Sequence, residues 1–178
     1  MINEHEQTHS MSNAITNQLS LVITALDGPE DAKAFKTLNE EWITRLFTLE
    51  EEDRRILNDP QAEIVDRGGR VLLARIDGRI VGCVALVPGH PGMFELGKMS
   101  VEPELRNHGI GRKIVIAAIS EARRIGAHSI FLGSSTRLPA AVHLYESLGF
   151  THVTREELGP LPYARADTFM RLLLRQAG

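Results

Sequence analysis

VEPELRNHGIGR, at residues 101–112, joins an apolar run that ends at Val101 to a long helical pattern at residues 113–125. A strand, a glycine-containing loop and a helix N-terminus in that order make a pocket for a phosphate or pyrophosphate. The backbone N–H groups of the loop and first helical turn have no helical carbonyl to bond, and the helix dipole favours an anion there. Arg106 and Arg112 add positive charge. The segment therefore predicts a site for a phosphorylated cofactor.

Length and composition are those of an ordinary globular protein. The 178 residues are 43% hydrophobic and 24% charged, which fits one domain with a sizeable core. The formal net charge of −3 disfavours general attraction to nucleic acid or to an anionic membrane. The single cysteine, Cys83, excludes an intrachain disulfide framework, and no signal peptide or bilayer-spanning apolar run is evident. We therefore expect a cytoplasmic protein with no nucleic-acid or membrane partner.

Apolar periodicity and turn residues predict one α/β domain over residues 19–178, built on a mixed sheet. The polar residues 1–18 are expected to form a disordered tail, with Met11 as an alternative start. Expected strands lie at residues 19–26, 70–76, 79–87, 94–101, 129–132, 150–153 and 168–174. Expected helices lie at residues 29–46, 113–125 and 139–148. A short helix is also expected to start from a capping box at residues 48–51 and to end just before Asn58. Residues 155–165 are expected to form a loop.

Two motifs make the chain resemble the general N-acetyltransferase (GNAT) superfamily over roughly residues 19–175. The family pattern Arg/Gln-x-x-Gly-x-Gly/Ala matches residues 106–111, and the pattern Ala-x-x-Leu-Tyr-x-x-x-Gly-Phe matches residues 141–150. A lone Gly-x-Gly is weak evidence, but the two motifs together, with a helix and a strand between them, are specific. Residues 40–43 and 162–167 are similar to a bacterial subgroup whose substrates are mostly unassigned.

The resemblance implies a mixed, mostly antiparallel sheet whose fourth and fifth strands splay apart, with helices on both faces and acetyl-CoA as cosubstrate. The pantetheine arm would lie in the opening and bond the backbone of Met99, Ser100 and Val101 like an added strand. Loop amides would wrap the pyrophosphate, and glycines there let the backbone approach the phosphates. The residues of this loop are Arg106, Asn107, His108, Gly109, Ile110, Gly111 and Arg112.

Acetyl transfer to an amine needs a base, a stabiliser for the thioester oxygen and an acid for the leaving thiolate. By resemblance, Tyr145 is the candidate acid; the alternative is a partly buried tyrosine with a structural role. Glu95 is the candidate base, because some family members place a glutamate at this offset before the motif arginine. The alternatives are an exposed strand-end glutamate and a chain of waters as base. The backbone N–H of Met99 is expected to hold the thioester oxygen.

One position departs from the family pattern. The family often has an asparagine that bonds the pantetheine where this chain has Leu138. That contact is either lost or supplied by Ser134, Ser135 or Arg137, and one neutral hydrogen bond is worth about 1 kcal/mol.

The acceptor side of the fold is expected to include two pairs of residues. Glu41 and Arg45, one helical turn apart, either present paired charges to a zwitterionic substrate or form an ordinary surface ion pair. Tyr163 and Arg165 either bind a substrate carboxylate, through the arginine fork, or pack on the sheet. The acidic run at residues 50–53 is expected to be a solvated helix start.

The remaining reactive side chains predict no further chemistry. The seven histidines lack the spacing of metal ligands, so no metal is expected. Cys83 and Trp42 are expected in the core; the alternatives are a covalent acetyl-cysteine for Cys83 and stacking on a ligand for Trp42. We expect an acetyl-CoA-dependent N-acetyltransferase that acts by direct transfer in a ternary complex on a small amine or amino-acid-like metabolite. A protein N-terminus as acceptor and a non-catalytic acyl-CoA-binding module are the alternatives, and the sequence leaves a homodimer open.

Overall fold

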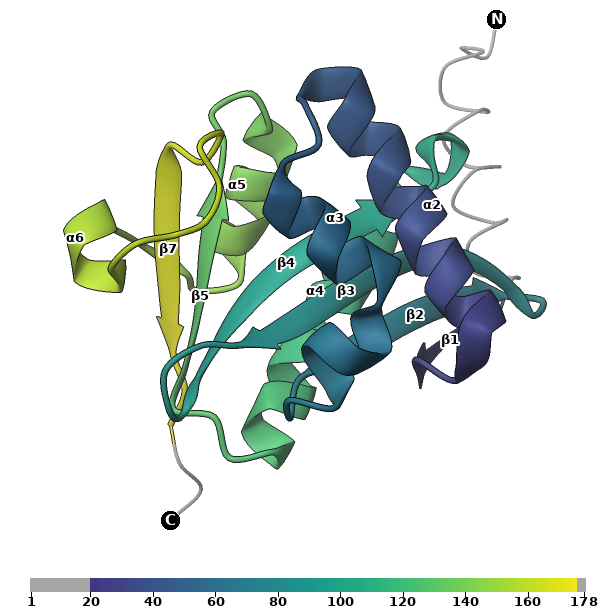
Figure 1. Ribbon diagram of the computed structural model, residues 1–178, viewed down its shortest axis with the longest axis horizontal. Helices are drawn as coiled ribbons and strands as arrows, with labels where there is room; N and C mark the ends of the chain where they lie inside the picture. The colour runs from purple at the N-terminus through teal and green to yellow at the C-terminus, as the bar shows by residue number, and fades with distance from the viewer. Residues whose placement is uncertain (1–19, 176–178) are drawn as a thin grey trace, which may run out of the picture.

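A seven-stranded sheet forms the centre of the computed structural model, which describes residues 20–175 (Figure 1). The strands lie in the order β1-β2-β3-β4-β5-β7-β6, and β4–β5 is the one parallel pair within this range. This arrangement confirms the predicted mixed, mostly antiparallel sheet; the expected tail and Met11 lie outside the described residues. The strands are β1 Leu21–Ala25, β2 Arg70–Ile76, β3 Arg79–Pro88, β4 Met93–Val101, β5 Ser129–Ser134, β6 Thr151–Val153 and β7 Thr168–Leu173.

Helices cover both faces of the sheet. Figure 1 shows α2 and α3 on the near face and α4 on the far face, where α5 shares its hydrophobic cluster. The helices are α2 Gly28–Leu46, α3 Glu51–Asn58, α4 Ile110–Arg124, α5 Pro139–Ser147 and α6 Arg155–Leu158, with a π-helical turn η1 Gln61–Val65 and a 3-10 turn η2 Pro103–Leu105.

The alternation of side chains along the central strands divides the core into two layers. Leu73 and Cys83 pack with α2 and α3, whereas Leu72 and Val84 pack with α4. Successive strand residues point to opposite faces, so continuous apolar runs such as β3 fill both layers. The burial of Cys83 confirms its predicted place in the core, and Trp42 is half-buried against the α2–α3 layer.

Local structure agrees with most of the predicted elements and corrects three. The helix after the glycine loop begins at Ile110 rather than Lys113, because Gly109 adopts a left-handed φ of 78° and serves as its N-cap. The capping box of α3 pairs the Glu50 N–H with Asp53, two residues later than the expected box at residues 48–51. Both candidate boxes join residues three positions apart, so spacing in the sequence cannot tell which one forms. The expected loop at residues 155–165 begins with the short helix α6, capped by Thr154.

The strands β4 and β5 pair only at their beginnings. The register joins Met93 to Ser129, Phe94 to Ile130 and Glu95 to Phe131, and pairing then stops although both strands continue. Beyond this point β4 stays paired with β3 and β5 stays paired with β7. The two strands therefore diverge and open the sheet at its centre, as the resemblance implies.

Candidate active site

A cavity of about 580 Å³ occupies the opening between β4 and β5. On the α4 side it is lined by the N-terminus of α4 and by α5, and on the α2 side by the end of α2 and by Tyr163, Arg165 and Ala166. Because helices from both faces of the sheet line the same space, the cavity passes through the sheet between the diverging strands. It can therefore hold one long ligand on one face and a second molecule on the other.

The glycine loop has the conformation of an anion site. Asn107 and Gly109 have left-handed φ values of 66° and 78°, and the first N–H groups of α4 have no helical carbonyl to bond. A Cβ added at Gly111 would meet protein atoms no closer than 3.8 Å, so packing within the protein does not require glycine there. Open space above two glycines at a helix N-terminus fits the diphosphate of a nucleotide cofactor.

The two arginines of this loop have different partners. Arg106 donates to the Val101 carbonyl oxygen at 3.1 Å and lies 3.3 Å from a Glu41 carboxylate oxygen, so it ties the loop to β4 and α2. Arg112 donates to the Ser147 hydroxyl at 2.9 Å, a neutral partner. Arg106 therefore also shapes the loop, whereas the charge of Arg112 has no counter-charge within residues 20–175.

Tyr145 lies in the wall of the cavity. Its ring is buried and packs against Phe150 with ring centroids 5.6 Å apart. Its hydroxyl has no hydrogen-bond partner among residues 20–175. Burial raises the pKa of Tyr145 above its ordinary value, so the hydroxyl keeps its proton at neutral pH. A protonated phenol without a protein partner can donate to a ligand.

Glu95 lies at the apex of the opening, where the pairing of β4 with β5 ends. Burial raises the pKa of this carboxyl from 4.5 to about 7, while the nearby charge of Lys98 works to lower it. A carboxylate with a pKa near 7 can accept a proton at neutral pH and release it again. Glu95 also lines a second cavity of about 360 Å³, on the side of residues 158–162.

A β-bulge lies at the middle of β4. Ala85 pairs with Gly97 and Cys83 with Ser100, so Lys98 and Met99 together face a single residue of β3. Lys98 has a left-handed φ of 52°, which is uncommon for a residue with a side chain. The bulge turns the Lys98 side chain to the α3 side of the sheet, while Met99 packs toward α4.

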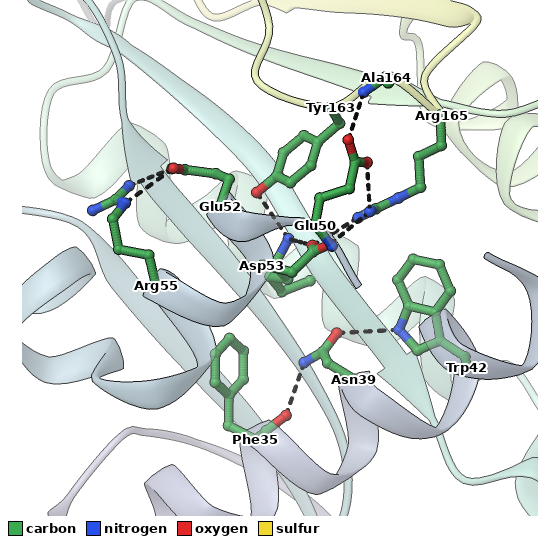
Figure 2. Close-up of polar contacts among 11 residues, drawn as sticks. Phe35, Asn39, Trp42, Glu50, Glu52, Asp53, Arg55, Tyr163, Ala164 and Arg165 are labelled. Carbon is green, nitrogen blue, oxygen red and sulfur yellow. Dashed lines mark hydrogen bonds and ion pairs between the residues drawn. The ribbon is translucent and has the colours of Figure 1, made fainter. Parts of the chain in front are cut away.

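The Lys98 side chain enters a buried ionic network that the sequence did not predict. Its ammonium lies 2.8 Å from Asp53 and 2.9 Å from the Tyr163 hydroxyl. Asp53 also accepts two hydrogen bonds from Arg165, at 2.7 and 2.8 Å, and Glu50 bonds Arg165 and the Ala164 N–H (Figure 2). The network joins α3, β4 and the segment before β7 on the α2 side of the cavity.

Asp53 is the centre of this network and is fully buried. Burial works to raise its pKa, but hydrogen bonds from Arg165 and Lys98 outweigh that effect and lower it to about 2. The expectation that residues 50–53 form a solvated helix start is therefore wrong for Asp53. A charged residue within the apolar run of β4, Lys98, was the one sequence signal for such a partner.

Three of the four residues predicted to bind the acceptor line the cavity, and one does not. Arg45 lines the cavity, but Glu41 does not; the two form an ion pair at 3.1 Å. Tyr163 and Arg165 both line the cavity, yet the guanidinium of Arg165 is held by Asp53 and Glu50. Trp42 also lines the cavity, and its indole N–H donates to buried Asn39 (Figure 2).

Polar groups of the loop between β5 and α5 bond one another and Asp167, which lies just before β7. Ser135 accepts the Arg137 N–H through its hydroxyl, and Asp167 accepts two hydrogen bonds from Thr136. Leu138 is the N-cap residue of α5 and offers no side-chain hydrogen bond. The guanidinium of Arg137 lies over the ring of Phe47, 4.7 Å from its centroid, at the cavity wall.

Residues 20–175 offer neither a metal-ligand cluster nor a membrane-spanning helix. They contain no group of three or more histidine, cysteine, aspartate or glutamate side chains that could hold a metal ion. None of their helices has the length and apolar character needed to cross a membrane.

Comparison with known proteins agrees with this geometry. The model of the acetyltransferase (GNAT) family matches residues 34–150. An uncharacterized N-acetyltransferase of Schizosaccharomyces pombe is 31% identical over 158 residues, covering 86% of this chain and 94% of that protein. A GNAT acetyltransferase of Staphylococcus aureus has a TM-score of 0.80 at 20% identity, covering 88% and 100% of the two chains. A Salmonella typhimurium protein solved with its cofactor acetyl-CoA has a TM-score of 0.69 at 25% identity, covering 89% and 96%.

The chain belongs to the acetyltransferase (GNAT) family. It is an N-acetyltransferase whose cosubstrate is acetyl-CoA. The open glycine loop and the cavity between β4 and β5 fit this cosubstrate, because they offer an anion site followed by a passage through the sheet.

Proposed function

We propose that the protein transfers an acetyl group from acetyl-CoA to the primary amine of a small metabolite, directly, within a ternary complex. The observation that carries the proposal is the shared cavity: the glycine loop, Tyr145 and Glu95 all line one space that passes through the sheet. Acetyl-CoA would enter from the α4 side, with its phosphates on the loop amides. The amine would enter from the α2 side, near Trp42 and Tyr163.

Three groups of the chain supply the chemistry. The Glu95 carboxylate accepts a proton from the acceptor ammonium, directly or through a water, which its pKa of about 7 favours. The Met99 N–H, in the bulged part of β4, donates to the thioester oxygen as negative charge develops there. The Tyr145 hydroxyl donates its proton to the departing sulfur. Glu95 then loses its proton to solvent through the second cavity, which it also lines.

Direct transfer fits the position of the single cysteine. Cys83 is fully buried, and burial raises the pKa of its thiol to about 12, so it offers no thiolate to carry an acetyl group. Initial rates measured with both substrates varied should give intersecting double-reciprocal lines. Parallel lines, the sign of a covalent acetyl-enzyme, would contradict direct transfer.

The function is tested by following CoA thiol release with acetyl-CoA and a panel of amines that includes amino acids, simple amines and peptides with free N-termini. We expect thiol release with small amines. Release only with peptides would identify a protein N-terminus as the acceptor. Stabilisation by acetyl-CoA without release on any amine would identify a non-catalytic binding module.

A further inference from the structure

The charges around the cavity are unequal. Within residues 20–175 its lining includes six cationic side chains but one carboxylate, Glu95. Four of the cations have carboxylate partners among the described residues, and two have none there. The two cationic side chains without a carboxylate partner indicate where the cavity could bind a negatively charged group of a ligand.

Two of the partnered cations lie in the buried network. Lys98 is 2.8 Å from Asp53, and its side chain is only 4% exposed. Arg165 bonds Asp53 at 2.7 Å and Glu50 at 3.1 Å, so its N–H groups toward α3 are occupied. A substrate carboxylate would have to displace a buried ion pair to reach either cation, which is costly.

The other two partnered cations share one carboxylate. Arg45 lies 3.1 Å and Arg106 lies 3.3 Å from the two oxygens of Glu41. This pair of contacts neutralises part of the charge between α2 and the glycine loop.

Arg112 and Arg137 are the two cations without a counter-charge among residues 20–175. Arg112 bonds only the Ser147 hydroxyl, at the C-terminal end of α5, whereas Arg137 stacks on Phe47 beyond the N-terminal end of α5. The length of α5, about 13 Å at 1.5 Å per residue, separates Ser147 from the end of the helix next to Arg137. Arg112 lies in the first turn of α4, beside the glycine loop that would hold the phosphates of the cosubstrate. Arg137 faces Phe47 of the α2–α3 connection, on the acceptor side.

We propose that Arg137 binds a carboxylate on the acceptor, so that the acceptor is an amino acid with a free carboxylate beside its amine. This inference rests on the proposed function and adds the substrate class. The guanidinium lies over the ring of Phe47, and its N–H groups make no hydrogen bond within residues 20–175, so they can bind a carboxylate in a bidentate manner. Glu95 would receive the ammonium and Arg137 the carboxylate, so one negative and one positive side chain of the cavity match the two charges of a zwitterion.

The test compares each of a panel of L-amino acids with its own carboxamide, measuring kcat/KM by CoA thiol release. The carboxamide keeps the shape and loses the negative charge. Its amine is also less basic, so intrinsic reactivity at neutral pH works against the expected preference. We expect the best amino acid to exceed its carboxamide by about ten- to hundredfold, the range for a hydrogen-bonded charge pair. In Arg137→Gln this ratio should approach one, and in Arg137→Lys it should be intermediate because the fork is lost and the charge is kept.

Two further variants distinguish carboxylate binding by Arg137 from a general effect of positive charge at the cavity. Arg112→Gln should raise the KM for acetyl-CoA and leave the ratio of amino acid to carboxamide unchanged. Arg123→Gln, an exposed arginine of α4 outside the cavity, should change neither.

Equal rates for amino acids and carboxamides in the wild type would overturn the inference and leave the proposed function standing. So would a preference that persists in Arg137→Gln, or an Arg137→Gln variant in which only the KM for acetyl-CoA changes. The absence of thiol release with every amine would overturn both.

Discussion

Replacing Glu95 with glutamine should change the free energy of unfolding in a pH-dependent way. Relative to the wild type, the variant should be more stable at pH 8 than at pH 5. The pKa of Glu95 is 4.5 in a free side chain and about 7 in the fold, because burial disfavours the charged form. A raised folded pKa gives stability that is present below pH 4.5 and is lost as the pH rises to 7. Each pKa unit is worth about 1.4 kcal/mol, so the loss is about 3 kcal/mol. Glutamine keeps the shape and does not ionise.

Urea unfolding of both proteins at pH 5 and pH 8 measures this difference. The difference in unfolding free energy between variant and wild type should shift by about 3 kcal/mol in favour of the variant on going to pH 8. Glu121→Gln is a control without this pH dependence. Hydrogen bonds from Arg124 and Arg70 lower the pKa of Glu121 below 4.5, so the residue is ionised at both pH values and its removal should destabilise the protein about equally at pH 5 and pH 8. Equal pH dependence of stability in wild type and Glu95→Gln would show that Glu95 is not held in a poorly solvated site, and the reasoning would fail.

Two other predictions concern the acid and the ionic network. Tyr145→Phe keeps the ring packing on Phe150 but removes the proton donor, so kcat should fall at least tenfold with little change in the KM for acetyl-CoA; an unchanged kcat would exclude Tyr145 as the acid. Asp53→Asn removes the shared counter-charge of Lys98 and Arg165 and should cost about 3–5 kcal/mol of unfolding free energy in urea titrations. A loss below about 1 kcal/mol, the range of an exposed pair, would mean that the network is solvated.

The fold was predictable because its signals are local or belong to two specific motifs. Asp77 and Gly78 both adopt left-handed φ, as an Asp-Gly hairpin turn requires, and the positions of β2 and β3 follow from it. The glycine loop likewise has a backbone conformation that its glycines permit.

The polar part of the site was less predictable because it depends on pairs distant in sequence. Lys98 and Asp53 are 45 positions apart, and only the bulge in β4 brings the lysine to the α3 side. The sequence also cannot tell which arginines of the cavity have carboxylate partners. The structure shows that Asp53 and Glu50 hold Arg165, whereas Arg137 has no carboxylate partner within residues 20–175. Alternation along a strand predicts which face a side chain takes, but it cannot predict where a bulge interrupts it.

Calorimetric titration of wild type and Gly111→Glu with acetyl-CoA measures whether the amides at the start of α4 bind the diphosphate of the cosubstrate. The added side chain has room in the fold, since the atoms nearest to a Cβ at this position are 3.8 Å away. The helix dipole also stabilises an acidic residue in the first turn, so the fold should tolerate the substitution. The wild type should bind one acetyl-CoA per chain. The variant should show no detectable binding while its melting temperature stays equal or rises. Equal binding by the two proteins, or no binding by the wild type at millimolar acetyl-CoA, would show that these amides do not hold the diphosphate.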